Sequence, residues 1–263
     1  IGPTPTVIKK MGDKLQAKEI AKKVNIPTLD TVEKVSLAKK IGFPLMIKAA
    51  AGGGGKGMRI VKDSASLKDA ASAAKREALS GFGDDRIFFE RYIEKSRHIE
   101  VQILGDDKNV VHLGERECSI QRRHQKIIEE SPSRRLSEEL RLNICEDAKR
   151  IAQAIKYTSA GTVEFLLDDK TGEYWFLEVN TRLQVEHPVT EEVTGIDIVQ
   201  EQINIANKKS ISFLNNDAAD LGHSFGHSIE VRIYAENPEN DFLPETGEIF
   251  IYQPSEIDGI RWE

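Results

Sequence analysis

The chain has 263 residues, of which 39% are hydrophobic and 30% are charged, and its formal net charge at pH 7 is -6. These values are typical of a globular protein with a substantial core, and they exclude a disordered chain and a generally basic nucleic-acid-binding surface. No apolar run reaches the roughly 20 residues that a membrane-spanning helix needs, and no pattern indicates secretion. Cys118 and Cys145 are too few for a disulfide framework or a zinc site, so we expect a reducing compartment.

The first half of the chain alternates helix and strand patterns. Asp13 is suited to cap a helix that stops before Pro27, and a second helix is expected over residues 31–41, ending on Gly42. The pattern then predicts a buried strand at 44–49, a strand at 58–61, a helix at 66–79 that Gly81 ends, and strands at 87–92, 98–104 and 110–113. The turn-like segment 105–109 predicts that the last two strands form a hairpin.

The second half continues the alternation. Ser137 opens the longest expected helix, whose first turn is acidic, as the helix dipole favours. Strands at 162–167 and 174–179 predict a hairpin, a further helix is expected over 197–207, and the polar segment 215–226 indicates a boundary. These elements predict an α+β fold with antiparallel hairpins. Because the chain opens with Ile1 and a strand pattern begins again near its end, we expect a piece of a longer protein.

Four successive glycines precede Lys56 and Gly57. A P-loop would need glycine at Ala50 and a hydroxyl residue at Gly57, and a dinucleotide-binding loop would open a helix, whereas a strand pattern follows here. Both alternatives are therefore excluded. The segment predicts a hairpin tip whose backbone N–H groups can approach phosphates, with the Lys48 ammonium nearby. The competing interpretation is a hairpin without a ligand.

A pair of acidic residues occupies the predicted hairpin. If its loop is centred near residue 171, Glu164 and Glu178 face each other on adjacent strands. Alternation places Glu164 and Phe165 on opposite faces of the first strand. On the second strand it places Glu178 on the same face as Phe176 and Asn180. Two facing carboxylates repel unless a cation binds them, and oxygen ligands suit Mg²⁺. The alternative is a coincidental pair of half-exposed acids.

Three polar residues follow at a spacing of two. Arg182, Gln184 and Glu186 would share one side of an extended segment, where they could hold a small oxyanion and remove its proton. The alternative is a polar loop whose arginine pairs with a nearby acid. His187, which precedes Pro188, is expected to be structural.

Four strings of the sequence closely resemble the biotin carboxylase signature within the ATP-grasp superfamily: residues 48–58, 97–102, 115–126 and 178–191. The resemblance covers essentially the whole chain. The sequence is similar to the biotin carboxylase parts of propionyl-, methylcrotonyl- and acetyl-CoA carboxylases and of pyruvate carboxylase. It implies an ATP-grasp fold at 1–220, in which two α+β subdomains clamp ATP and one, at about 25–92, is a mobile glycine-rich lid. Residues 221–263 would begin the C-terminal biotin carboxylase domain.

The resemblance also implies roles for individual residues. The residues implied in ATP binding are Lys14, Lys48, Gly53, Gly54, Gly55, Glu90, Tyr92, Ile93, His98, Gln121 and His124. Glu164, Glu178 and Asn180 would bind Mg²⁺ or Mn²⁺, and Arg182, Gln184 and Val185 would bind bicarbonate. The implied catalytic residues are Glu186 as the base, Arg182, Lys126 near the γ-phosphate, and Arg232 beside the biotin enolate. The basic stretch 116–126 could indicate nucleic-acid binding, but Glu115 and Glu117 accompany it and it lacks interleaved aromatic residues, so a site that faces nucleotide phosphates explains it better.

The implied activity is ATP-dependent carboxylation of carrier-bound biotin by bicarbonate through carboxyphosphate. Its cofactors would be ATP, Mg²⁺ or Mn²⁺, and biotin as the carrier-bound substrate. The partners would be a biotin carboxyl carrier, a carboxyltransferase and, in the full-length form, a second copy of the chain, with no nucleic acid or membrane. We expect the cytoplasm, or the mitochondrial matrix in a eukaryote. The alternatives are a carbamoyl-phosphate synthase type of ATP-grasp ligase and an ATP-binding fragment that is inactive alone.

Overall fold

The computed structural model of the protein describes residues 1–52, 57–122, 125–211 and 226–263. Its contacts divide the chain into two compact units, Ile1–Val231 and Arg232–Glu263. The division follows Val231 and not residue 220, because the strand that ends at Val231 pairs with the sheet of the first unit. The predicted family boundary at residue 220 stays a prediction.

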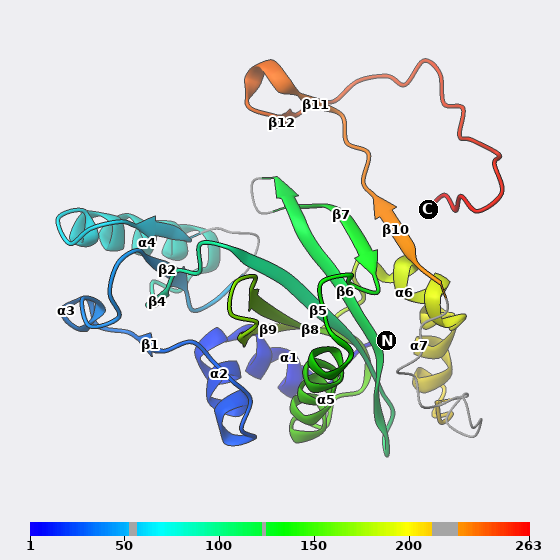
Figure 1. Cartoon of the computed structure of the whole chain (residues 1–263), viewed down its shortest axis with the longest axis horizontal. Helices are drawn as coiled ribbons and strands as arrows, with labels where there is room; N and C mark the ends of the chain where they lie inside the picture. Colours follow the sequence, from blue (N-terminus) through cyan, green and yellow to red (C-terminus); the bar gives the residue numbers. More distant parts are fainter. Residues whose placement is uncertain (53–56, 123–124, 212–225) are drawn as a thin grey trace. The chain divides into compact units, whose positions relative to one another are not determined.

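The first unit contains a four-stranded antiparallel sheet in the order β1-β4-β2-β3 (Figure 1). Its elements are β1 (Thr31–Val32), α3 (Val35–Ala38), β2 (Leu45–Ala49), β3 (Arg59–Val61), α4 (Leu67–Phe82) and β4 (Ile87–Arg91). Alanines on one face of α4 pack against the alternate apolar residues of β2 and β4, and these side chains form a core of their own. The expected glycine-rich hairpin corresponds to the pairing of β2 with β3.

A six-stranded antiparallel sheet forms the larger part of the unit, in the order β10-β7-β6-β5-β8-β9. Its strands are β5 (Ser96–Gly105), β6 (Val110–Arg122), β7 (Gln125–Ser131), β8 (Ser159–Asp168), β9 (Tyr174–Asn180) and β10 (Ser228–Val231). The surrounding helices are α1 (Pro5–Gly12), α2 (Lys14–Lys23), α5 (Glu138–Ala154), α6 (His187–Thr194) and α7 (Ile198–Ala206). The elements confirm the predicted α+β fold with antiparallel hairpins.

Alternation along β5 separates the core of this sheet from its polar face. Ile99, Val101 and Ile103 point to the side covered by α1, α2 and α5, where they join the main apolar core. Glu100 and Gln102 therefore point to the opposite side, which we call the site face. Leu104, also on that side, packs with residues of α7, so the polar residues occupy only part of the site face.

The predicted pairing of Glu164 with Glu178 is confirmed, but the predicted facing of Phe176 is wrong. Glu164 lies opposite Glu178, whereas Phe165 lies opposite Phe176, because an irregularity between these pairs inserts one residue into β9. Phe176 consequently turns into the core, with its ring centroid 6.3 Å from that of Phe165. The bulge lets β9 present an acid to the site face and an aromatic ring to the core.

Two predicted helices differ from the structure. Residues 31–41 do not form one helix, because Thr31–Val32 pairs with β4 and only Val35–Ala38 is helical. Helix α4 continues past Gly81 to Phe82, and Gly83, with φ 70°, ends it in the left-handed conformation. Strand β7, helix α1 and helix α6 were not predicted.

The second unit contains a two-stranded sheet of β11 (Glu236–Asn237) and β12 (Leu243–Pro244), joined by the 3-10 turn Pro238–Asn240. The polar segment that indicated a boundary lies almost wholly outside the described residues. In the part of the chain that the structure describes, no helix is long and apolar enough to cross a membrane.

Candidate functional site

Four charged residues form one row across the site face. Arg116 of β6 lies opposite Glu100 of β5, Glu100 lies opposite Glu164 of β8, and Glu164 lies opposite Glu178 of β9. Neighbouring strands are about 4.8 Å apart, so three carboxylates follow one another at close range. Glu100 and Glu164 are buried, and such carboxylates stay ionised only beside cations.

Lys126 of β7 supplies a central cation. Its Nζ forms ion pairs with Glu100, with Glu186 and, at 3.2 Å, with Glu164. Burial disfavours its charged form, but Glu100 and Glu164 outweigh burial and raise the pKa of Lys126. The same contacts act on the acids: burial raises the pKa of Glu186, but Lys126 and Arg116 together lower it to about 2. One lysine thus holds three buried carboxylates together.

His98 binds the other oxygen of Glu164. Its Nε2 lies 2.5 Å from Glu164 Oε2, and Gln121 Nε2 lies 3.0 Å from its Nδ1. Burial lowers the pKa of His98, but the neighbouring Glu164 carboxylate raises it above its usual value overall. His98, Glu100 and Gln102 are at alternate positions of β5 and share the site face. The structure therefore brings His98, Gln121, Lys126 and Glu164 together.

The three predicted metal ligands lie on adjacent strands of the site face. Asn180 Nδ2 donates to Glu164 Oε1 at 2.7 Å, and Glu178 pairs with Lys14 of α2. Their carboxylate and amide oxygens fit a hard divalent cation such as Mg²⁺. Lysines form ion pairs with both carboxylates in this structure. A bound divalent cation would therefore replace these ammonium groups as the partner of the two acids.

Two other groups of side chains have ligand atoms within 4.8 Å of one another in the described part of the chain: His98, Glu100 and Glu164, and Glu100, Cys118 and Glu186. Burial raises the pKa of the Cys118 thiol well above its usual value, so the second group offers a protonated sulfur. A thiol is a poor ligand for a hard cation. Glu164 is the residue that the first group shares with the predicted metal ligands.

Arg116 is completely buried, which corrects the expectation that it faces the nucleotide phosphates. Its guanidinium donates to Glu100 Oε1 at 2.8 Å, to Gln102 Oε1 at 2.7 Å and to Gln184 Oε1 at 3.3 Å. It also donates to Thr162 and to Thr190 of α6. Sequence reasoning missed this role, because the partners of Arg116 lie on other strands and on α6, whereas its chain neighbours Glu115 and Glu117 pair with Arg141 and Arg97.

The segment that follows β9 divides its polar residues between the interior and the solvent. Gln184 and Glu186 are buried, whereas Arg182 is exposed and donates to the neighbouring Leu183 carbonyl at 3.1 Å. Val185 is 60% exposed. The three residues do not share the side of an extended segment, because the chain bends at residue 182 and turns at 185–186 to enter α6.

Gln184 connects the buried network to the row of acids. Its amide nitrogen donates to Glu164 Oε1 at 3.1 Å, while its oxygen accepts from Arg116. The backbone carbonyl of Gln184 also lies 2.9 Å from His187 Nδ1, which agrees with a structural role for His187. The bicarbonate residues expected from the sequence are therefore split: Gln184 is fixed inside, and Arg182 and Val185 lie at the surface.

Three further predicted nucleotide residues, Glu90, Tyr92 and Ile93, lie in β4 or directly after it. Glu90 is 1% exposed and lies between Lys48 and Lys18, with Lys48 Nζ at 2.8 Å. Tyr92 is half-buried and Ile93 is buried. Gly53, Gly54, Gly55 and His124 lie outside the described residues, and Arg232 belongs to the second unit.

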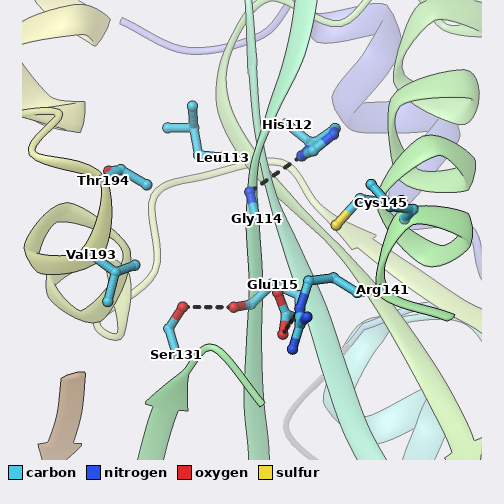
Figure 2. A pocket seen from close by; sticks show the side chains of 10 residues that line it. His112, Leu113, Gly114, Glu115, Ser131, Arg141, Cys145, Val193 and Thr194 are labelled. Carbon is cyan, nitrogen blue, oxygen red and sulfur yellow. Dashed lines mark hydrogen bonds and ion pairs between the residues drawn. The ribbon is translucent and has the colours of Figure 1, made fainter. Parts of the chain in front are cut away.

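A separate pocket opens between β6, β7, α5 and α6 (Figure 2). Its polar groups are bound to one another: Arg141 Nε donates to Glu115 Oε1 at 3.1 Å, and Ser131 Oγ donates to the Glu115 carbonyl at 2.8 Å. Burial raises the pKa of Glu115, while Arg141 opposes that shift. These contacts indicate a structural junction between the sheet and α5.

The chain is similar to several known proteins over nearly its whole length. Residues 10–214 match the family described as Carbamoyl-phosphate synthase L chain, ATP binding domain. The chain is 49% identical to Biotin carboxylase of Nostoc sp., covering 99% of the chain and 59% of the relative. It is 48% identical to the mitochondrial propionyl-CoA carboxylase alpha chain of Homo sapiens, covering 99% of the chain and 37% of the relative.

Solved structures show the same similarity. A biotin carboxylase complex from Campylobacter jejuni superposes with a TM-score of 0.90 and 44% identity, covering 96% of this chain and 57% of the other. The biotin carboxylase domain of Hydrogenobacter thermophilus 2-oxoglutarate carboxylase, whose structure contains MgADP and bicarbonate, gives a TM-score of 0.87 and 44% identity, covering 92% and 55%. The chain thus spans less than two thirds of the length of these relatives.

Proposed function

Because the chain belongs to the ATP-grasp family of the carbamoyl-phosphate synthase L chain ATP-binding domain, and resembles biotin carboxylases along nearly its whole length, we propose that it takes part in ATP-dependent carboxylation of biotin. The observation that carries this proposal is the row of acids Glu100, Glu164 and Glu178, of which the first two are buried, together with Lys126, which forms ion pairs with Glu100, Glu164 and Glu186. Such a site can bind a metal-bound triphosphate and deprotonate a small oxyanion.

In the proposed reaction the nucleotide lies along the site face. Glu164, Glu178 and Asn180 hold Mg²⁺ or Mn²⁺, and Lys14 and Lys48 bind the phosphates. A bound divalent cation neutralises the charge that develops on the phosphates during transfer. Tyr92, Ile93 and Glu90 border the base, and His98, Gln121 and His124 lie near the ribose and phosphates. Gly53, Gly54 and Gly55 belong to the lid that we place at about 25–92, within an ATP-grasp domain at 1–220.

Glu186 is the proposed base for bicarbonate. Beside Lys126 its pKa is about 2, which makes it a weak base in this structure. Because the Lys126 ammonium is the main cause that lowers this pKa, its withdrawal raises the basicity of Glu186. A triphosphate is a competing partner for Lys126. We therefore propose that Glu186 becomes an effective base when Lys126 turns toward the γ-phosphate.

Arg182, Gln184 and the Val185 backbone are the proposed bicarbonate-binding groups. A bicarbonate oxygen, once its proton passes to Glu186, attacks the γ-phosphorus, the bond from phosphorus to the β-bridging oxygen breaks, and ADP leaves. The product is carboxyphosphate. Its breakdown yields CO₂ and phosphate, and the phosphate takes the ureido proton of biotin. Arg232 is proposed to stabilise the resulting enolate, which captures CO₂ to form carboxybiotin.

The proposed partners follow from the same resemblance. A biotin carboxyl carrier presents biotin, and a carboxyltransferase uses the product, in a compartment that is the cytoplasm or the mitochondrial matrix. Residues 221–263 are proposed to begin the C-terminal biotin carboxylase domain, and a second copy of the chain completes a homodimer in the full-length form.

ATP cleavage that depends on both bicarbonate and biotin tests the proposal. We expect Glu186→Gln to abolish this cleavage while Mg·ADP binding is retained, because the substitution removes the base and leaves a similar shape. Retained turnover would remove Glu186 from the base role. Stimulation by ammonia in place of biotin would favour the carbamoyl-phosphate synthase type of reaction, and nucleotide binding without cleavage by the wild type would indicate a binding fragment.

A further inference from the structure

One buried carboxylate in the four-stranded sheet is shared by two lysines. Glu90 of β4 forms ion pairs with Lys18 of α2 through Oε1 and with Lys48 of β2 through Oε2, the latter at 2.8 Å. Thr31 of β1 donates a hydrogen bond to Glu90 Oε1 at 3.1 Å. The cluster thus joins α2 to three strands and contains one more positive than negative charge.

The charges of this cluster depend on one another because the groups are buried. Glu90 is 1% exposed and Lys18 is 4% exposed. Burial raises the pKa of Glu90, but Lys48 and Lys18 outweigh it and lower the pKa to about 2. An ionised carboxylate at this depth requires a cation at all times, since an unpaired buried charge is strongly unfavourable.

The two lysines are held differently. Lys18 also donates to Thr31 Oγ1 at 3.4 Å, and its Nζ lies 6.0 Å from the centroid of the Phe88 ring. For Lys48, Glu90 is the partner that the described residues provide. If Lys48 turned toward a phosphate, Glu90 would still be neutralised by Lys18, and no buried acid would be left without a cation.

We propose that Lys18 is a positioning residue that keeps Glu90 neutralised and so releases Lys48 to bind nucleotide phosphates. The inference rests on the proposed function in one respect, which is that Lys48 contacts phosphate. Without Lys18, the full attraction of Glu90 falls on Lys48, and each phosphate contact by Lys48 would leave Glu90 buried and unpaired.

Calorimetric binding of Mg·ADP and of adenosine tests this role. We expect Lys18→Met to weaken Mg·ADP binding about tenfold or more while adenosine binding changes little, because the loss concerns the phosphate contact of Lys48. Lys18→Arg should restore most of the Mg·ADP affinity, since it returns the charge. Thr31→Val is the matched control: it removes a hydrogen bond from the same cluster but no charge, and both affinities should stay near those of the wild type.

The outcomes separate this inference from the proposed function. If the wild type fails to bind Mg·ADP, the nucleotide site itself is refuted, and this role with it. If the wild type binds and Lys18→Met binds equally well, or loses Mg·ADP and adenosine affinity to the same degree, the positioning role is refuted alone.

A second comparison applies if Lys18→Met does not fold. Glu90→Gln removes the acid that Lys18 neutralises, so adding Lys18→Met to Glu90→Gln should change Mg·ADP affinity by less than about twofold, as expected of residues coupled through one partner. A further large loss in the double variant would contradict the proposal.

Discussion

Glu164 and Glu178 lie directly opposite each other on β8 and β9, yet their carboxylates have different cationic partners. Glu164 is bound by Lys126 and His98 at the centre of the site face, whereas Glu178 is bound by Lys14 from α2. The repulsion between neighbouring acids is thus relieved from two sides. Both lysines have proposed phosphate contacts, so one binding event could exchange ammonium partners for a divalent cation at both acids.

Glu164→Gln is expected to impair metal-dependent nucleotide binding. The amide keeps the shape of the side chain but removes the charge that attracts a divalent cation. The factor by which Mg²⁺ enhances ADP binding should therefore be smaller than in the wild type by about tenfold or more. Titrations of ADP at several Mg²⁺ concentrations measure this change. Glu173→Gln, an exposed position in the turn of the same hairpin, is the control. An unaltered Mg²⁺ dependence in Glu164→Gln would exclude Glu164 as a metal ligand.

Arg116 is expected to contribute strongly to stability. Arg116→Met leaves the buried Glu100 with Lys126 as its remaining cation and deprives Gln102, Gln184 and two threonines of a donor. Removing one member of such a buried pair typically costs about 3–5 kcal/mol. Urea unfolding measures the loss, and the exposed Arg134→Met should remain within about 0.5 kcal/mol of the wild type. Equal stability of both variants would mean that the buried network contributes little.

The sequence allowed the β8–β9 hairpin to be predicted because a short connection sets the register of adjacent strands. It did not allow the row that begins at Arg116 to be predicted, since the neighbours of β5 in the sheet are determined by contacts distant along the chain. Glu100 lies opposite Glu164, 64 residues later (164 minus 100). Phe176 was misplaced because one inserted residue in β9 reverses the facing that strict alternation requires.

The wrong helix at 31–41 has a similar cause. Within this range only Val35–Ala38 is helical, while Thr31 and Val32 complete the four-stranded sheet by pairing with β4. Tertiary pairing thus overrode a local preference. The site residues came from a resemblance of long motifs, and spacing alone would have placed Arg182 on the same side as Gln184 and Glu186, whereas it is exposed and they are buried.

Glu90 is expected to make the stability of the protein dependent on acid pH. Its folded-state pKa of about 2 lies below the ordinary value of 4.5, so its stabilising contribution is present above pH 4.5 and is lost as the pH falls toward 2. The shift corresponds to about 3 kcal/mol at most. Unfolding of the wild type and of Glu90→Gln should be compared at pH 6 and pH 3. We expect their difference in free energy to shrink at pH 3, and a constant difference would show that Glu90 is not the titrating group.

Gly161 is expected to be required for the geometry of the site face. A Cβ atom at this position would lie 2.2 Å from Tyr157 Oη, and Tyr157 is fully buried, with its hydroxyl donating to the Ala160 carbonyl at 2.9 Å. The Gly161 carbonyl accepts a hydrogen bond from Gln102 at 2.9 Å. Displacement of the Tyr157 ring or of the Gly161 backbone would therefore shift β8 at the neighbouring residues Thr162 and Glu164.

Gly161→Ala should destabilise the protein by about 1–3 kcal/mol, as overpacking does, and should also weaken Mg·ADP binding. Gly12→Ala is the matched control, because a Cβ there meets no atom within 4 Å and the backbone is not left-handed. That substitution should leave stability unchanged or raise it slightly. Thermal unfolding with and without Mg·ADP measures both effects. If Gly161→Ala unfolds like Gly12→Ala, then Tyr157 has room to move and the close contact does not restrain β8.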